Sequence, residues 1–314
     1  MPKTIVLEIP KLDLPTRLDL LIAGYSQFSR RQAKELISQG SVFISNRRIR
    51  RASRLYSGPL NIKIFLGNQD SIEKEAQQIH WPDLILYQDS DLLAMNKPAG
   101  IPTAPTPNSA VHNVYEYLKR NSIIPSTYYP FHRLDKGTSG ILLIPLTRRM
   151  AHSLNEQMQK RNIIKIYSAI CLGHLTSKNI IIKGYISRQR PHSPRFQFFK
   201  EETAGSRYSE TIIKVLREAR LPLSLVEAQP KTGRTHQIRL HLASLNHPVL
   251  GDPLYGPRSI PDFLPANSLS QRMFLHCREM SFFHPFIRDQ ITISATLPEH
   301  FLQILRELFP DSPE

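Results

Sequence analysis

The chain has 314 residues, 40% of them hydrophobic, and is longer than a typical single domain, so we expect two domains with sizeable cores. Its 41 Lys and Arg against 26 Asp and Glu give a net charge of +15, which suits a polyanionic partner such as nucleic acid or an acidic membrane face. No apolar stretch reaches the roughly twenty residues of a membrane span, and the first residues do not resemble a signal peptide, so we expect a soluble, cytoplasmic protein. Cys171 and Cys277 form no CxxC pair, so we do not expect a disulfide-rich protein.

The first 65 residues carry more than half of the excess charge, with twelve Lys and Arg against four Asp and Glu, a net charge of +8. Apolar residues at helical spacing predict one helix near 18–22 and a second helix that Ser29 caps. Strands are expected at 42–44 and 60–65. Charged surfaces are most often only solvated, but so dense an excess on a small αβ module favours contact with phosphates.

Short segments of this region resemble the S-four-type RNA-binding domain, a small domain named after a ribosomal protein. The likeness lies in Arg17-Leu18-Asp19, Ser29-Arg30, Gly40-Ser41-Val42 and Ile44-Ser45-Asn46. The resemblance implies RNA contacts, which we expect from Arg30, Arg31, Lys34, Arg47, Arg48 and Arg50. We place this domain at residues 1–66 and a polar linker at 67–81.

Apolar segments after the linker predict a second domain over residues 82–314. Two short strands, at 84–87 and 92–95, flank a polar turn. The second strand ends in Asn96-Lys97-Pro98-Ala99-Gly100, where Lys97 is a cation on a rigid turn and a further candidate for RNA contact.

A single acid stands in a loop of cations, hydroxyls and glycines, His132-Arg133-Leu134-Asp135-Lys136-Gly137-Thr138-Ser139-Gly140. Positive charge on Arg133 and Lys136 favours the ionised form of Asp135, which is then a poor proton donor but an available nucleophile. Gly137 and Gly140 allow backbone angles that are closed to other residues, and the apolar run 141–144 predicts a buried strand. An isolated Asp between basic residues is more often part of an ordinary turn, so other segments must decide its role.

The next two elements also carry candidate residues. Thr147 can cap a helix in which Met150, Leu154 and Met158 recur at four-residue spacing on the buried face. A strand over 163–170 follows, and its period of two puts Lys165 and Tyr167 on one face. Tyr167 could therefore face a site, although a lone tyrosine on a strand more often belongs to the core or its rim.

A third segment with candidate functional residues is Lys231-Thr232-Gly233-Arg234-Thr235-His236-Gln237-Ile238-Arg239-Leu240-His241-Leu242-Ala243. Thr235 is placed to cap a helix, and Arg239 projects near the N-terminal end of that helix, where it can hold a carboxylate bidentately. His236 and His241 are five residues apart, a spacing that does not align two ligands on one helix face. We therefore expect no metal site.

Together these segments resemble the Rlu-type pseudouridine synthases, which isomerise uridines in large-subunit ribosomal RNA and transfer RNA. The likeness spans about residues 82–290 and also includes His247-Pro248-Val249-Leu250-Gly251-Asp252-Pro253-Leu254-Tyr255-Gly256, Phe274-Leu275-His276 and Phe283-His284-Pro285. The resemblance implies that Asp135 is the nucleophile, that Tyr167 stacks on the target base and that Arg239 pairs with Asp135. It also implies that Arg133 fills the space vacated by the flipped nucleotide.

The resemblance contributes to the expected fold, an α+β catalytic domain with a long mixed, mostly antiparallel sheet flanked by helices and loops, preceded by the small αβ module. Detaching uracil and rejoining it through carbon needs an ionised acid and no metal or redox group, so we expect no cofactor. We expect a monomer that acts on RNA. The RNA-binding module favours large-subunit ribosomal RNA, with transfer RNA as the alternative.

Two other functional classes stay open. A glycoside or nucleoside hydrolase would also use a carboxylate at a sugar, but such sites normally need a second acid, and the companion segments offer Tyr, Arg and His. A noncatalytic RNA-binding or ribosome-assembly factor fits the charge and the first domain equally well. Residues 188–209 match the family poorly and form either a substrate-specific insertion or an RNA-contacting loop.

Overall fold

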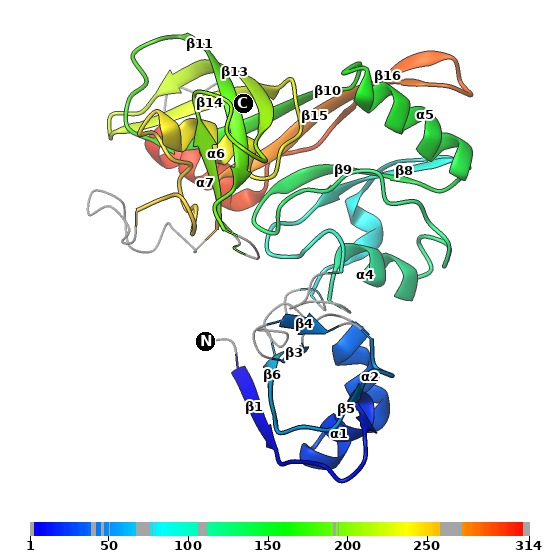
Figure 1. Ribbon diagram of the computed structural model, residues 1–314. Helices are drawn as coiled ribbons and strands as arrows, with labels where there is room; N and C mark the ends of the chain where they lie inside the picture. Colours follow the sequence, from blue (N-terminus) through cyan, green and yellow to red (C-terminus); the bar gives the residue numbers. More distant parts are fainter. Residues whose placement is uncertain are drawn as a thin grey trace. The chain divides into compact units, whose positions relative to one another are not determined.

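The computed structural model describes residues 3–38, 42–44, 47–49, 51–66, 76, 78–105, 112–190, 193, 195–257 and 272–309. The chain forms two compact units, one of Met1–Trp81 with Ile101–Ile123 and the other of Pro82–Gly100 with Ile124–Glu314 (Figure 1). This division places in the first unit both residues 101–123, expected in the second domain, and residues 67–81, expected as a linker. Most of the expected linker, 67–81, lies outside the described residues.

The first unit contains an antiparallel sheet with the strand order β1-β6-β3-β4 and a separate two-stranded pair, β2-β5. Its elements are β1 (Lys3–Ile9), β2 (Thr16–Arg17), α1 (Leu18–Tyr25), α2 (Arg30–Ser38), β3 (Val42–Ile44), β4 (Arg47–Ile49), β5 (Leu55–Tyr56), β6 (Leu60–Leu66) and α4 (Val114–Arg120). The predicted cap of the second helix is confirmed. The Ser29 hydroxyl accepts a hydrogen bond from Gln32 N–H at 3.2 Å, and the Gln32 side chain accepts one from Ser29 N–H at 2.8 Å, which is a capping box.

The second unit is built on a ten-stranded sheet with the order β12-β11-β13-β14-β10-β15-β9-β8-β7 and β16 beside β15. Its elements are β7 (Ile85–Gln88), β8 (Leu92–Lys97), β9 (Ser139–Pro145), α5 (Arg148–Gln159), β10 (Ile164–Leu172), β11 (Asn179–Arg188), β12 (Phe196–Phe199), β13 (Arg207–Glu218), β14 (Leu223–Pro230), α6 (Gln237–Ser244), β15 (Leu275–His284), β16 (Asp289–Ser294) and α7 (Glu299–Leu308), while a short 3-10 helix (Trp81–Leu84) precedes β7. Within the described residues, every pairing is antiparallel except that of β9 with β15. The predicted α+β class with a mixed, mostly antiparallel sheet is confirmed.

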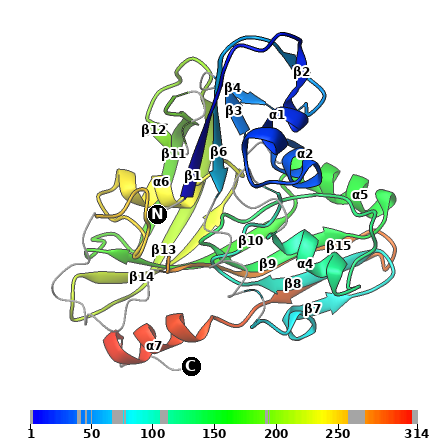
Figure 2. The ribbon, with the colours of Figure 1, turned by 90° about the horizontal axis from the view of Figure 1, so that it is seen from below.

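Helices cover both faces of this sheet. On β10, Ala169 packs in a cluster with Ile238 of α6, whereas the next residue, Ile170, packs with Phe301 of α7. Successive strand residues point to opposite faces, so α6 and α7 lie on opposite sides of the sheet, as Figure 2 shows. Tyr167 belongs to the clusters under both α5 and α6, so these two helices share a face. No helix in the described ranges combines the length and apolar composition needed to cross a bilayer.

The parallel pairing of β9 with β15 requires glycine at position 140. Gly140 pairs with Cys277 and has a φ of 108°, and a Cβ built there would lie 2.2 Å from the Cys277 carbonyl oxygen. The expectation of a backbone angle closed to other residues is therefore right for Gly140. It is wrong for Gly137, which has no positive φ and whose Cβ position would make ordinary contact with Met273 at 3.4 Å.

Candidate active site

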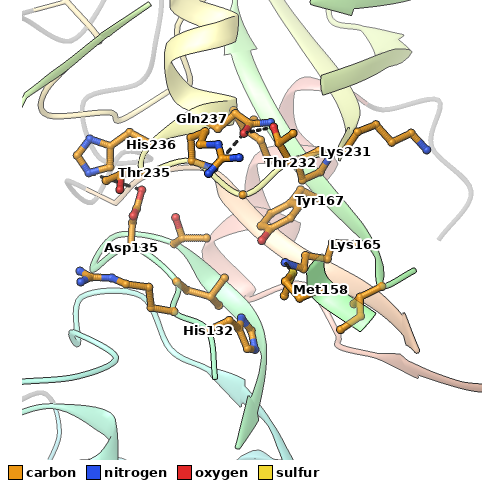
Figure 3. A pocket seen from close by; sticks show the side chains of 18 of the residues that line it. His132, Asp135, Met158, Lys165, Tyr167, Lys231, Thr232, Thr235, His236 and Gln237 are labelled. Atoms are coloured by element: carbon orange, nitrogen blue, oxygen red, sulfur yellow. Dashed lines mark hydrogen bonds and ion pairs between the residues drawn. The ribbon is translucent and has the colours of Figure 1, made fainter. Parts of the chain in front are cut away.

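A pocket of about 590 Å³ lies on the face of the sheet that α5 and α6 share. Segments far apart in the sequence line it: residues 131–138, the end of α5, the start of β10, residues 230–236 and the start of α6 (Figure 3). Among the described lining residues seven are Lys or Arg, and Asp135 is the one acid. The predicted lone carboxylate therefore stands in a strongly cationic pocket.

Asp135 and Arg239 are in direct contact. Nη1 of Arg239 donates a hydrogen bond to Oδ2 of Asp135 at 3.0 Å, and the two side chains are 5% and 20% exposed respectively. Asp135 comes from the loop before β9, and Arg239 comes from the first turn of α6. The fold thus brings together two of the residues that the sequence singled out, one acidic and one basic.

Asp252 is a part of this arrangement to which the sequence assigned no role. Its oxygens accept hydrogen bonds from Nε and Nη2 of Arg239 at 2.7 and 2.8 Å, and from Leu254 N–H and Tyr255 N–H at 2.8 and 3.1 Å. Burial raises the pKa of Asp252, but the hydrogen bonds and charge of Arg239 outweigh burial and hold the pKa below its ordinary value. The bidentate partner of Arg239 is therefore Asp252, and Asp135 receives the remaining guanidinium nitrogen.

His236 connects the Asp135–Arg239 pair to Tyr255 and to the start of β12. Its Nδ1 lies 2.8 Å from the Tyr255 hydroxyl oxygen, which also accepts a hydrogen bond from Phe196 N–H at 2.9 Å. The hydroxyl proton is then directed at Nδ1, which leaves Nε2 as the protonated ring nitrogen. Nε2 lies 3.8 Å from Oδ2 of Asp135, and burial lowers the pKa of His236. His236 is thus a neutral imidazole beside Asp135, at a distance too long for a hydrogen bond.

The helix cap expected in this segment is wrong. Helix α6 begins at Gln237, so the capping position falls on His236 and not on Thr235. His236 has a φ of 58°, a left-handed angle that is uncommon for a residue with a side chain. The Gln237 amide oxygen instead orders the preceding turn, because it accepts hydrogen bonds from Arg234 N–H at 3.0 Å and from the Thr232 hydroxyl at 2.7 Å.

Lys165 and Tyr167 project from β10 into the pocket, on one face of the strand as predicted (Figure 3). Burial raises the pKa of Tyr167 well above 10, and the neighbouring Cys277 raises it further. The phenol is therefore neutral at any physiological pH. The amine of Lys165 donates to the sulfur of Met158 at 3.1 Å, and burial lowers its pKa.

Two further candidate residues differ in exposure, since Arg133 is exposed and Lys97 is buried. Arg133 is exposed and lines the pocket. Lys97 has no exposed surface, and its amine donates to the Pro98 carbonyl oxygen at 2.7 Å. Burial lowers the pKa of Lys97 to about 7. The expectation that Lys97 contacts RNA is corrected, because its side chain at the end of β8 is completely buried.

Three of the six candidate RNA-contacting cations of the first unit lie on α2. Arg30 and Lys34 have half-exposed side chains and lie 3.1 and 3.9 Å from the carboxylate of the fully buried Asp19. Arg31 is exposed. Arg47 and Arg48 lie in β4, and Arg50 lies outside the described residues.

The segment that matched the family poorly, 188–209, contributes to the pocket region. It forms β12 and the start of β13, and the ring of Phe196 packs edge-on against His236 with centroids 5.6 Å apart. Arg207, at the start of β13, lines the pocket.

Comparisons with known proteins identify the family of this chain. The family described as RNA pseudouridylate synthase matches residues 91–244. An uncharacterized RNA pseudouridine synthase of Bacillus subtilis, YhcT, is 35% identical over 230 residues, which cover 72% of each chain. The chain belongs to the RNA pseudouridine synthase family. This synthase is accordingly an isomerase.

Relatives of this pseudouridine synthase carry names with different RNA substrates. Ribosomal large subunit pseudouridine synthase D of Xylella fastidiosa is 31% identical over 94% of this chain and 90% of its own. The tRNA pseudouridine synthase C of Haemophilus ducreyi is 32% identical over 71% of this chain and 94% of its own. Among solved structures, human RNA pseudouridylate synthase domain containing 1 has a TM-score of 0.56 at 26% identity, over 68% of this chain and 83% of that one.

Proposed function

We propose that this pseudouridine synthase modifies RNA of the large ribosomal subunit, with Asp135 as nucleophile, Arg239 as the residue that orients it and Tyr167 as the platform for the target base. One observation carries this assignment. The guanidinium of Arg239 is fixed by Asp252 and donates its remaining nitrogen to Asp135, the one acid among the described residues of a cationic pocket.

The chemistry balances with these residues alone. A carboxylate oxygen of Asp135 attacks C1′ of the ribose, the bond from C1′ to N1 breaks, and uracil leaves with the electron pair. After uracil turns, its C5 attacks C1′ and displaces the carboxylate. C5 then loses its proton and N1 gains one, so nothing is oxidised or consumed. Because Oδ2 accepts the hydrogen bond from Arg239, the attack is assigned to Oδ1.

Access to a uridine in folded RNA requires that the nucleotide leave its stack, at a few kcal/mol, and stacking on an aromatic ring recovers about 1 to 3 kcal/mol. Tyr167 offers such a ring inside the pocket, and Arg133 offers an exposed guanidinium at its wall. Both positions suit the roles that the family resemblance implies.

The choice of ribosomal RNA is supported by how far the relatives extend. The large-subunit relative aligns with nearly the whole of this chain, whereas the transfer RNA relative leaves more than a quarter of it unmatched. The first unit, proposed here as an S-four-type RNA-binding domain, presents half-exposed or exposed cations on α2. We extend the proposal to a monomer in the cytoplasm, whose reducing environment suits the two free cysteines.

Carbodiimide mapping of pseudouridine in total cellular RNA tests the proposal directly. Cells without the gene should lack at least one large-subunit mark, and the wild-type gene should restore it while Asp135→Asn does not. Restoration by Asp135→Asn would refute the nucleophile. A lost mark that lies in transfer RNA would refute the substrate, and no lost mark with defective ribosome assembly would favour the noncatalytic alternative.

A further inference from the structure

Three arginines at the pocket have no part in the chemistry described above. Arg161 follows α5, Arg207 begins β13, and Arg234 precedes α6, yet all three line the same pocket. Each of them is linked to Tyr208, which follows Arg207 in β13. Nε of Arg234 donates to the Tyr208 carbonyl oxygen at 3.0 Å, and the charge of Arg161 acts on the Tyr208 phenol.

These guanidinium groups lack an acidic counterpart. None of the three forms an ion pair with an acid in the described part of the chain, whereas Arg239 and Arg278 do. The nearby carboxylate of Glu210 accepts a hydrogen bond from the Tyr208 hydroxyl at 2.7 Å and lies 3.9 Å from Lys183. Burial lowers the pKa of Arg234, and the charges of Arg207 and Arg161 lower it further, so the three cations repel one another.

Like charges gathered without an anion raise the energy of the free protein, and a bound anion removes that cost. A phosphodiester fits the arrangement because guanidinium groups donate paired hydrogen bonds to phosphate oxygens. A neutral base edge would leave most of the repulsion in place. Arg234 is already oriented through Nε, which leaves its terminal nitrogens for an oxyanion.

We propose that Arg161, Arg207 and Arg234 form a phosphate clamp that binds one backbone phosphate of the RNA strand entering the pocket. The clamp rests on the proposed function, since it takes RNA as the substrate. It would fix the strand at one point of the pocket while Asp135 meets the ribose of the target nucleotide. It also gives residues 188–209 an RNA-contacting role through Arg207.

Salt-dependent RNA binding by the full-length protein tests the clamp. The probe is a fluorescein-labelled ten-nucleotide oligouridylate, with fluorescence anisotropy measured across a series of KCl concentrations. Each arginine is changed singly to Gln, and all three are changed together. A triple Gln variant at Arg148, Arg220 and Arg272, which are exposed and do not line the pocket, is the matched control.

For single-stranded nucleic acid, the slope of log Kd against log salt changes by about 0.7 for each phosphate that is neutralised. The clamp variant should bind at least about tenfold more weakly, and its slope should fall by about 0.7, because three arginines share one phosphate. The control variant should change the slope by less. A slope equal to the wild type's, or a fall of about 2 from three separate phosphate contacts, would overturn the clamp.

Binding to oligouridylate does not require turnover, so this readout is independent of the Asp135 assignment. A wild-type thermal melting temperature of the triple variant shows that weaker binding does not reflect unfolding. In the RNA identified by mapping, a neutral methylphosphonate at one position should weaken wild-type binding but not binding by the clamp variant. Equal losses for both proteins at every position would again contradict the proposal.

Discussion

Asp252 receives two hydrogen bonds from Arg239, at 2.7 and 2.8 Å, and both side chains are at least 95% buried. Two backbone N–H groups hold the same carboxylate from the other side. The guanidinium plane is therefore fixed before any substrate binds, and its third nitrogen is aimed at Asp135. Such preorganisation lets the site stabilise charge without rearranging during the reaction.

Replacing Asp252 with Asn should slow turnover while leaving RNA affinity nearly unchanged. The amide cannot accept both guanidinium hydrogen bonds as a charged group does, so Arg239 loses its orientation toward Asp135. A misplaced group near the reacting atoms costs on the order of 10²-fold in rate. Single-turnover pseudouridine formation and oligouridylate affinity measure the two effects, with the exposed Asp289→Asn as control. A parallel loss of affinity and an unchanged single-turnover rate would contradict the positioning role.

Tyr167 should act through its ring and not through a phenolate. Because burial raises its pKa well above 10, the hydroxyl stays protonated. Tyr167→Phe keeps the ring and should retain most of the single-turnover rate. Tyr167→Leu should lose about 1 to 3 kcal/mol of stacking free energy, which corresponds to a roughly 5- to 150-fold lower single-turnover rate. If the Phe variant is as impaired as the Leu variant while both melt like the wild type, the hydroxyl is needed and the stacking role is insufficient.

Acid should destabilise the second unit through His276, which links β9 to β15. Its Nδ1 lies 2.9 Å from the Ser139 hydroxyl, and its Nε2 lies 3.4 Å from the Ala295 carbonyl oxygen. Burial lowers its pKa from 6.5 to about 4, so the unfolded chain binds more protons between these pH values. The unfolding free energy is therefore greatest above pH 6.5 and falls as pH drops toward 4, by up to about 3 kcal/mol from this group.

Chemical denaturation at several pH values checks this expectation. His276→Gln should be less stable at neutral pH but lose less stability on acidification than the wild type does. His152→Gln, on the exposed side of α5, is the control for the chemical change. Wild-type and His276→Gln proteins with the same pH slope would rule out this contribution.

Asp19→Asn should destabilise the first unit. The Asp19 carboxylate is fully buried, and it accepts two hydrogen bonds from Arg17 at 2.9 and 3.1 Å and one from Arg30 at 3.1 Å. Without its charge, these cations lose their counterion, which should lower the unfolding free energy by about 1 to 3 kcal/mol. Hydrogen exchange over α1 and α2 in the full-length protein measures the loss, with the exposed Asp13→Asn as control. Unchanged protection would show that the ion pairs add no net stability.

The elements that local pattern determines were predictable. The buried run 141–144 became β9, and Thr147 caps α5 by accepting a hydrogen bond from Met150 N–H at 3.4 Å. The period of two along β10 correctly placed Lys165 and Tyr167 on one face. Such features depend on neighbours within a few residues, so a single sequence contains the information.

The parts that depend on distant chain segments were not predictable. Asp252 looked like one polar residue in a turn, and its role exists because the fold places it beneath Arg239. Lys97 looked like a surface cation, but tertiary packing buries it completely. The helix start at Gln237 differs from the expected cap because the Gln237 side chain, and not that of Thr235, satisfies the preceding turn.

The parallel join between β9 and β15 has one more effect. Strands β9 and β15 pair at only two residue positions, and this pairing joins β7, β8 and β9 to the rest of the sheet. Asp135 is carried by the smaller group of strands, whereas Arg239 and Asp252 belong to the larger one. The Asp135–Arg239 ion pair therefore bridges that junction. With Asp135 as the proposed nucleophile, separation of β9 from β15 should stop turnover while most of the sheet stays intact.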